Sequence, residues 1–506
     1  MNSAYRELVE RLKTVYDLWS ASAVLEWDQV TYMPPGGADA RARQVRTLGQ
    51  LAHEAFTDPA IGRLLDALTP QVASLDDGSD EASLIRVTRD DYERAIRVPP
   101  SFMADYRGHM ALSTQVWAHA RPANDWAAVQ PYLEKMVDLT QQFADYFPGY
   151  QSAADPLIDY FAQEGLSSAE VSRIFGELRR ELVPLAQAIA ARPAVDDSFL
   201  YQHFDADQQL AFGMEAVERL GYDLTRGRED LTHHPFTTTF SIGDVRITTR
   251  VRENNLRSAL FATLHEAGHA LYEQGCDPTF EASPLMGGTS AGAHESQSRL
   301  WENLVGRSQG FWRFFYPRLQ AFFPDQLGQV PLDAFYRAIN KVQPSLIRVE
   351  ADEVTYNLHV MLRFDLEQDL LAGRLKAADA PDAYNARFKA DLGISPPDDR
   401  DGVMQDMHWF GYFLGAGYLG YTLGNIMSAQ FFEAALQAHP EIPDEIERGE
   451  FGTLLGWLKE NIYRHGRKFS APELVQRVTG GPLRIGPYVR YLRRKYGALY
   501  GIQWSP

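Results

Sequence analysis

Apolar positions recur at helical spacing through most of the chain. Leu8, Leu12, Val15 and Leu18 follow one another at intervals of three or four residues, which places them on one face of a helix. The same helical spacing of apolar residues recurs near residues 40–70, 80–120, 126–150, 167–192 and 207–221. Clusters of Pro, Gly or Asp separate these segments. The pattern therefore predicts a mainly α-helical protein.

One stretch departs from this pattern. Residues 236–251, FTTTFSIGDVRITTRV, are rich in β-branched and aromatic residues, with Gly243-Asp244 in the middle. We expect a lone hairpin whose two strands are joined by a Gly-Asp turn. The helical pattern resumes directly after it, and an edge strand beside a cleft can hold an extended peptide through main-chain hydrogen bonds.

A second stretch, Met407 to Phe432, contains no Asp, Glu, Lys or Arg. Its length would allow it to span a bilayer. However, it is interrupted by several glycines, carries polar-tipped tyrosines and begins beside His408. We interpret it as a buried wall of a cleft.

The composition narrows the classes of function. The net charge of −18 disfavours binding to nucleic acid or to anionic membranes, which requires basic patches. Basic residues between 464 and 495 could suggest a nucleic-acid surface, but they lack a regularly spaced aromatic platform, so we expect a solvated helix face and no nucleic-acid partner. Cys276 is the only cysteine, which favours a small buried hydrophobe in a reducing compartment over a nucleophile. The first 19 residues carry charges and no apolar core of a signal peptide, so we expect a cytoplasmic protein.

The chain contains an HExxH motif at His265, Glu266 and His269. Residues four apart lie on one face of a helix, so both imidazoles can reach one metal ion. Zinc lowers the pKa of a bound water to about 7, and Glu266 could then act as the general base. The alternative is a helix with incidental histidines.

A catalytic zinc site needs a third protein ligand. Glu295 follows on the next predicted helix and is the candidate, while the adjacent His294 points about 100° away and is weaker. The alternative for Glu295 is a solvated acid at a helix start. Glu273 and Glu302 could orient metal ligands, but we expect surface salt bridges for both.

We expect one catalytic unit over residues 1–506, since no linker of disordered composition divides the chain. It comprises a helical region (1–230), a hairpin and metal-site region (231–310) and a helical region with substrate-binding motifs (311–506). These regions would surround a deep groove.

Several motifs in a fixed order resemble the carboxypeptidase Taq family of metallocarboxypeptidases over nearly the whole chain. They are WDQVTYMPPGGADAR (27–41), HPF (234–236), DxRxT (244–248), HEAGHALYEQG (265–275), HESQSRLWEN (294–303), IRxxAD (347–352) and GxxQDxHW (402–409).

This resemblance implies a mostly helical fold with a small sheet beside a deep groove. It implies an enzyme, often a homodimer, that removes C-terminal residues one at a time from peptides with a free C-terminus, with broad side-chain tolerance. It assigns His265, His269 and Glu295 as metal ligands and Glu266 as the base. The metal would be one divalent ion per chain, zinc by preference, with cobalt or manganese as alternatives.

Residues 410–425, FGYFLGAGYLGYTLGN, depart from the family pattern FGYFPSYTLGN. Tyrosines of this segment are expected to contact substrate. We assign Tyr418 to catalysis with His408, where they would stabilise an oxyanion, and Tyr421 to substrate binding. Tyr412 is the remaining alternative for these roles, and a core histidine is the alternative for His408.

Two arginines are candidates for binding the substrate carboxylate, because the guanidinium fork matches carboxylate geometry. Arg348 lies in the IRxxAD motif and Arg246 in the DxRxT motif on the predicted hairpin. The structural alternative for Arg348 is a helical ion pair with Asp352, four residues on.

Two other functions compete with a carboxypeptidase. A related zinc endopeptidase or peptidyl-dipeptidase would share HExxH and the downstream glutamate. An inactive metal-binding scaffold would have no use for Glu266, which argues against it.

Overall fold

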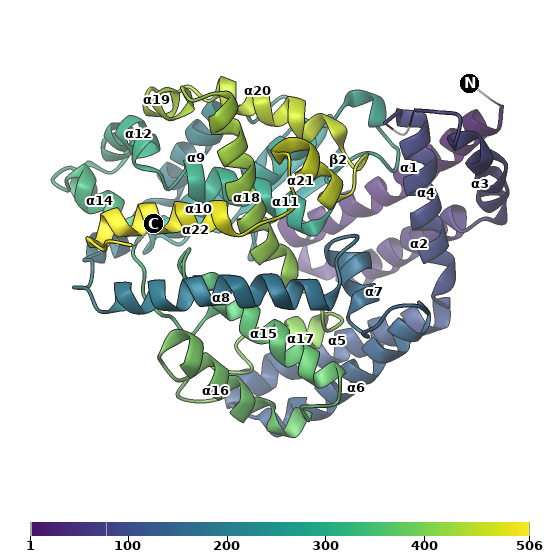
Figure 1. The fold of residues 1–506 in the computed structure, drawn as a ribbon, viewed down its shortest axis with the longest axis horizontal. Coiled ribbons are helices and arrows are strands. Elements are labelled where there is room, and N and C mark those ends of the chain that lie inside the picture. The colour runs from purple at the N-terminus through teal and green to yellow at the C-terminus, as the bar shows by residue number, and fades with distance from the viewer. Residues whose placement is uncertain (1–2, 77, 505–506) are drawn as a thin grey trace.

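A computed structural model describes residues 3–76 and 78–504, and it is helical almost throughout. Helix α18 (Leu419–Ala438) runs through the middle of the molecule, with the N-terminal helices α1–α4 gathered at one end (right in Figure 1). The long helix α8 crosses below it, and the C-terminal helix α22 lies near α8 (Figure 1). The mainly helical fold is as expected.

The helices before the sheet are α1 (Ser3–Thr31), α2 (Ala38–Phe56), α3 (Pro59–Val72), α4 (Asp80–Arg97), α5 (Pro100–Ala123), α6 (Trp126–Asp145), α7 (Asp155–Leu157), α8 (Ser168–Ala190) and α9 (Ala206–Leu220). Those after it are α10 (Leu256–Gln274), α11 (Ala291–Arg299), α12 (Gln309–Phe322), α13 (Pro324–Leu327), α14 (Leu332–Ile339), α15 (Tyr356–Leu371), α16 (Ala380–Leu392), α17 (His408–Gly411), α18, α19 (Ile442–Glu447), α20 (Gly452–Asn461), α21 (Ala471–Thr479) and α22 (Gly486–Tyr500). Short 3-10 or π turns occur at 35–37, 158–162, 198–201, 278–280, 300–305, 348–350, 377–379 and 463–465.

Helix α1 follows its hydrophobic pattern. Leu8, Leu12 and Val15 are buried in a small core that α1 to α4 share, whereas Leu18 is only partly buried. Asp58 and Ser79 cap α3 and α4 by accepting hydrogen bonds from free backbone N–H groups. Cys276 lies in the same core, and burial raises the pKa of its thiol to about 12. It therefore has the character of a buried hydrophobe.

The sheet has three strands, so the expected lone hairpin was incomplete. Strand β3 (Asp244–Thr249) pairs antiparallel with β2 (Thr237–Ser241) and parallel with β1 (Glu229–Leu231), which places β3 in the centre. Ser241 pairs with Asp244, so the turn residues are Ile242 and Gly243 rather than Gly-Asp. The pattern missed β1 because a three-residue strand is too short to show alternation.

Helix α11 approaches both α10 and α18 almost backbone to backbone. A Cβ at Gly268 of α10 would lie 2.6 Å from the carbonyl oxygen of Gln297 and from the Cα of Ser298 in α11. A Cβ at Gly424 of α18 would lie 2.7 Å from the Cβ of Glu295. These two glycines therefore allow α11 to lie close enough for Glu295 to reach the histidine helix.

We expect Gly268→Ala to lower the free energy of unfolding by about 1–3 kcal/mol, because the added methyl meets backbone that cannot rotate away. Denaturant unfolding would measure this. The matched control is Gly456→Ala in α20, where a Cβ has nothing within 4 Å and the same change should be neutral or stabilising. Equal effects of the two substitutions would contradict the close-packing argument.

The uncharged stretch 407–432 forms α17, a loop and most of α18. Leu423, Ile426 and Met427 are fully buried, as a wall of the protein interior would be. Among the described residues, no helix combines the length and the apolar character that crossing a bilayer requires. The interpretation as a buried wall is therefore the better one.

Candidate metal centre and active site

Three side chains from two helices converge as the sequence predicts. His265 and His269 lie one turn apart on α10, and Glu295 extends from α11. The Oε2 atom of Glu295 is 3.6 Å from Nε2 of His265 and 3.4 Å from Nε2 of His269. Tetrahedral bonds of ~2.0–2.1 Å to zinc place ligand atoms about 3.3 Å apart. The three residues therefore fit a divalent metal ion.

The second oxygen of Glu295 is engaged elsewhere. Arg299, one turn along α11, donates from Nε to Oε1 at 2.6 Å. Burial would raise the pKa of Glu295, but Arg299 and the two imidazoles hold it well below its usual range. Glu295 is thus an ionised candidate ligand that presents one free oxygen.

His265 is oriented by Glu302. Its Nδ1 lies 2.9 Å from Oε2 of Glu302, which implies an N–H donor on Nδ1 and leaves Nε2 as the metal-facing acceptor. Arg299 and Arg307 also donate to Glu302. Glu302 is buried and lies in a π-helical turn (Leu300–Val305), so the expectation of a surface salt bridge was wrong.

His269 is oriented through a second histidine. Its Nδ1 lies 2.6 Å from Nδ1 of His294, and Nε2 of His294 lies 2.6 Å from Oε1 of Glu273. If His269 uses Nε2 for the metal, protons on its Nδ1 and on Nε2 of His294 satisfy both bonds. Glu273 is buried, so it also was wrongly expected at the surface. Both ring nitrogens of His294 contact other side chains, so His294 is placed to support the candidate ligand His269.

We expect Glu302→Gln to weaken metal affinity by about 10–100-fold, because the amide can accept from His265 but carries no charge to strengthen that bond. Competition with a chelator would measure it. Asp369→Asn, which breaks the ion pairs of Asp369 with Arg374 and Arg387 far from α10, serves as the control and should leave affinity unchanged. Unchanged affinity in Glu302→Gln would remove Glu302 from the orienting role.

Glu266 lies beside the three ligands but is held by the sheet. Its Oε2 accepts a hydrogen bond from Oγ1 of Thr237 on β2 at 2.7 Å, and the same hydroxyl contacts the Glu266 carbonyl. A second buried carboxyl, Glu229 on β1, interacts with Glu266, and burial raises its pKa to about 7. Thr237 of the expected hairpin thus positions Glu266, the candidate general base.

Arg348 is buried in a polar cluster. It donates from Nε to Asp406 at 2.6 Å and from Nη1 to the hydroxyl of Tyr356 at 2.8 Å, and Gln405 accepts from its backbone N–H. Asp352 instead accepts hydrogen bonds from residues 343, 354 and 355, so the alternative of an Arg348–Asp352 pair was wrong. No hydrogen bond of the described residues uses Nη2 of Arg348.

Tyr356 links this cluster to the metal group. The guanidinium of Arg299 lies 4.8 Å from the centre of its ring, and its hydroxyl accepts from Arg348. Sequence reasoning gave no role to Tyr356 or Arg299. Arg299 could have been found, because it stands one helical turn after Glu295 on the same face.

His408 is fixed by Asp406, which accepts from its Nδ1. The ring of Tyr418 stacks on His408 at 4.5 Å, but its hydroxyl is buried without a hydrogen-bond partner among the described residues. Tyr421 is partly exposed and lies between His408 and Tyr356, with Arg348 5.2 Å from its ring. Tyr412 is about half exposed beside His408.

Arg246 lies apart from these groups. On β3 it donates twice to Asp244, each time at 2.8 Å, and it packs on the rings of Trp27 and Phe240. Among the described residues, no hydrogen bond, ion pair or ring contact joins Arg246 to Arg348, His408 or the metal group. The structure therefore brings together every candidate site residue except Arg246.

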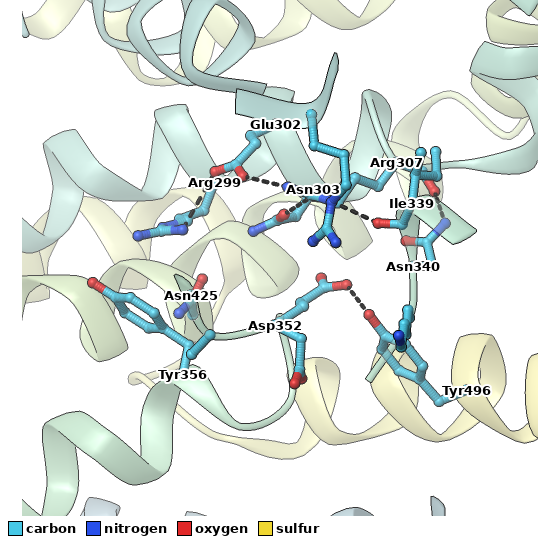
Figure 2. Close-up of a pocket in the computed structure, with 14 residues that line it drawn as sticks. Arg299, Glu302, Asn303, Arg307, Ile339, Asn340, Asp352, Tyr356, Asn425 and Tyr496 are labelled. Atoms are coloured by element: carbon cyan, nitrogen blue, oxygen red, sulfur yellow. Dashed lines mark hydrogen bonds and ion pairs between the residues drawn. The ribbon is translucent and has the colours of Figure 1, made fainter. Parts of the chain in front are cut away.

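A polar cavity of about 40 Å³, room for a few water molecules, lies behind the metal group. Figure 2 shows Arg299, Asn303 and Arg307 on one side of it and Asp352 with Tyr496 on the other. Its outer wall includes Lys341, which pairs with Asp197. The carboxylate and guanidinium groups behind the candidate ligands are thus ion-paired around a space large enough for water.

A comparison with known protein families identifies the family of this chain. The model of the carboxypeptidase Taq (M32) metallopeptidase family matches residues 7–496. The chain belongs to the carboxypeptidase Taq family. The resemblance noted in the sequence motifs is therefore confirmed.

Relatives of the carboxypeptidase Taq family match over their full length. Thermostable carboxypeptidase 1 of Thermus thermophilus is 41% identical, covering 99% of both chains, and carboxypeptidase 1 of Bacillus subtilis is 34% identical, covering 98% of both. The crystal structure of an M32 carboxypeptidase from Deinococcus radiodurans superposes with a TM-score of 0.96 at 47% identity, covering 99% of this chain and 100% of that one. A Pyrococcus furiosus carboxypeptidase structure gives 0.94 at 32% identity, covering 98% and 99%.

Membership in the carboxypeptidase Taq family makes the chain a metallocarboxypeptidase, which is a peptide hydrolase. It also implies a metal ion, for which His265, His269 and Glu295 are the candidate ligands among the described residues.

Proposed function

We propose that this carboxypeptidase removes single residues from the free C-terminus of peptides with broad side-chain tolerance, and that Glu266 is its general base. The observation that carries the proposal is the short path from the three ligands through Arg299 and Tyr356 to Arg348. The candidate metal ligands and Arg348 are thus joined by direct side-chain contacts, which supports a terminal carboxylate bound on the same side of the molecule as the scissile bond.

A divalent ion bound by the three ligands would polarise the scissile carbonyl and lower the pKa of a water molecule. Glu266 takes the proton of the attacking water and later delivers it to the leaving amine. The free Nη2 of Arg348 binds the terminal carboxylate of the substrate, while Asp406 and Tyr356 hold its other nitrogens. Thr237 keeps Glu266 in place throughout.

We further propose that the oxyanion donor is Tyr421, and that Tyr418 positions His408 by stacking on it. With Nδ1 of His408 donating to Asp406, its Nε2 can donate only when the ring is protonated. Burial lowers the pKa of His408, which favours the neutral ring. A partly exposed tyrosine hydroxyl is the better donor in that state. For Arg246 we propose an indirect role, which is to hold the outer face of β3 against Trp27.

The preferred metal is zinc, because two imidazoles and a carboxylate form a familiar catalytic zinc set, with cobalt or manganese as substitutes. We retain a homodimer and a cytoplasmic location as proposals. The first follows from the family resemblance and the second from the single cysteine.

We expect the metal-loaded enzyme to cleave an N-blocked dipeptide and to leave its C-terminal amide intact, because the amide offers no charge to Arg348. Release of the free amino acid would be followed by chromatography. Arg348→Met should raise KM for the acid far more than it lowers kcat. Equal cleavage of acid and amide would favour the related endopeptidase, and cleavage of neither would favour the inactive scaffold.

A further inference from the structure

The hydroxyl of Tyr356 has a proton that no protein group accepts. The residue begins α15 and is 8% exposed, and its oxygen accepts a hydrogen bond from Nη1 of Arg348 at 2.8 Å. A phenol that accepts in this way still has its own O–H to donate. No hydrogen bond of the described residues takes up that O–H. Because buried polar groups are normally satisfied, its acceptor has to come from outside the protein.

The surroundings of this hydroxyl favour a negatively charged acceptor. The guanidinium carbons of Arg299 and Arg348 lie 4.8 Å and 5.7 Å from the centre of the Tyr356 ring. Figure 2 shows the hydroxyl pointing away from Asp352 and Tyr496, on the side of the Arg299 guanidinium. Hydrogen bonds to an ionised acceptor are about twice as strong as those between neutral groups, so two neighbouring cations and a free O–H suit an anion.

The carboxylates nearest to the two arginines are engaged with other groups. Asp406 accepts from Nε of Arg348 and from His408. Glu295 accepts from Arg299 with one oxygen and turns the other toward the two candidate histidine ligands. No hydrogen bond among the described residues joins either acid to Tyr356. The acceptor of the tyrosine proton is therefore not one of these acids.

Arg348 presents a second free donor beside this hydroxyl. Its Nε donates to Asp406 and its Nη1 to Tyr356, whereas no hydrogen bond of the described residues uses Nη2. The three nitrogens belong to one planar group, so the free Nη2 and the tyrosine hydroxyl stand on either side of Nη1. A carboxylate has two oxygens and can accept from both donors at once. A primary amide has one oxygen and one NH₂ group, so it can accept from only one of them.

We propose that the hydroxyl of Tyr356 is the second donor to the terminal carboxylate of the substrate, and that it is the group that rejects C-terminal amides. This role rests on the proposed binding of the same carboxylate by Arg348. One carboxylate oxygen binds Nη2 of Arg348, and the other accepts from Tyr356. An amide turns its NH₂ group toward one of these buried donors, which is then left without an acceptor. Tyr356 thus contacts substrate and determines specificity.

Calorimetric titration of metal-loaded Glu266→Gln protein tests this role without turnover. In that background, Tyr356→Phe should weaken the binding of an N-blocked dipeptide by about 10–100-fold, as expected for the loss of a hydrogen bond to a charged group. Binding of the C-terminal amide should change little, so the preference for the acid should fall by a similar factor. Unchanged binding of the acid would overturn the proposal.

A double-mutant cycle separates direct contact from the positioning of Arg348. In the Arg348→Met background, Tyr356→Phe should still weaken binding of the acid several-fold, since the hydroxyl contacts the substrate itself. A tyrosine that only holds Arg348 in place would cause no further loss, and that result would overturn the direct contact. No loss in either single variant would instead contradict the carboxylate site of the proposed function.

Tyr488→Phe is the matched control. Tyr488 is fully buried, accepts from Asn357 of the same helix and donates to the carbonyl of Glu353, and none of its hydrogen bonds among the described residues involves Arg348. The control should lose stability in thermal unfolding and bind the acid as before. Equal losses of affinity in Tyr356→Phe and Tyr488→Phe would mean a general disturbance of α15 and would overturn the proposal.

A crystal structure of metal-loaded Glu266→Gln protein with the N-blocked dipeptide keeps the test decisive should Arg348→Met fail to fold. One carboxylate oxygen is expected within about 2.5–3.0 Å of the Tyr356 hydroxyl and the other beside Nη2 of Arg348. A carboxylate bound to Arg348 alone would overturn this inference and leave the proposed function intact. A carboxylate bound away from both residues would contradict both.

Discussion

Glu266→Gln should retain the metal and lose turnover by about 10²–10⁴-fold or more. The amide keeps the size of the side chain and can still accept the hydrogen bond from Thr237, so the local structure should persist. It cannot take a proton from water, which is the role proposed for Glu266. Metal content by elemental analysis and kcat on an N-blocked dipeptide would measure the two effects separately.

The matched control for this substitution is Glu229→Gln. Glu229 is a second carboxyl that interacts with Glu266 and is largely shielded from solvent, and burial raises its pKa to about 7, so an uncharged amide is a mild replacement there. It accepts from Thr263, which an amide can also do. Activity within a few-fold of wild type is expected for the control. Full turnover in Glu266→Gln would contradict the proposal that Glu266 is the general base.

Glu295→Gln should reduce metal affinity by more than about 100-fold, which is the upper end of the effect of losing an outer partner. An amide oxygen is a poor zinc ligand, and the substitution also leaves Arg299 without its nearest carboxylate. Chelator competition would give the affinity. Peptidase activity should return only at high metal concentration.

Glu353→Gln separates metal binding from the loss of a buried charge. The side chain of Glu353 is as buried as that of Glu295 and pairs with Lys495 at 2.7 Å. It lines the polar cavity behind the metal group, and none of its hydrogen bonds or ion pairs among the described residues involves a candidate ligand. Both variants should lose stability in thermal unfolding. Only Glu295→Gln should lose affinity, and equal loss in both would mean that folding rather than ligation is affected.

The sequence predicted the helical class and the pairing of the two candidate histidine ligands because both depend on local spacing. The spacing of four positions from His265 to His269 is about one helical turn, and that relation survives any packing of the helix. The prediction that Glu295 lies beside the two histidines depended on family motifs as well as on spacing. The close approach that makes it possible needs Gly268 and Gly424, whose role is visible only when both helices are placed.

The partners of the ligands could not be predicted in the same way. Glu302 and Glu273 had surface-like sequence contexts, and only the π-helical turn and the packing of His294 show that they are buried. Arg348 and Asp406 are 58 residues apart, so their pairing is a tertiary contact with no local signal. Strand β1 was missed for a related reason. Its three residues are too few to show a strand pattern, and only its pairing with β3 identifies it as a strand.

The contacts of α11 with α10 and α18 have a consequence for the protein without its ion. Where backbones touch, no layer of side chains is present that could rearrange into a second packing. We therefore expect the three helices to move as one rigid body, so that the candidate ligands His265, His269 and Glu295 keep their spacing when no ion is bound. The metal ion should then bind and dissociate reversibly at a preformed site, without folding or unfolding of the protein.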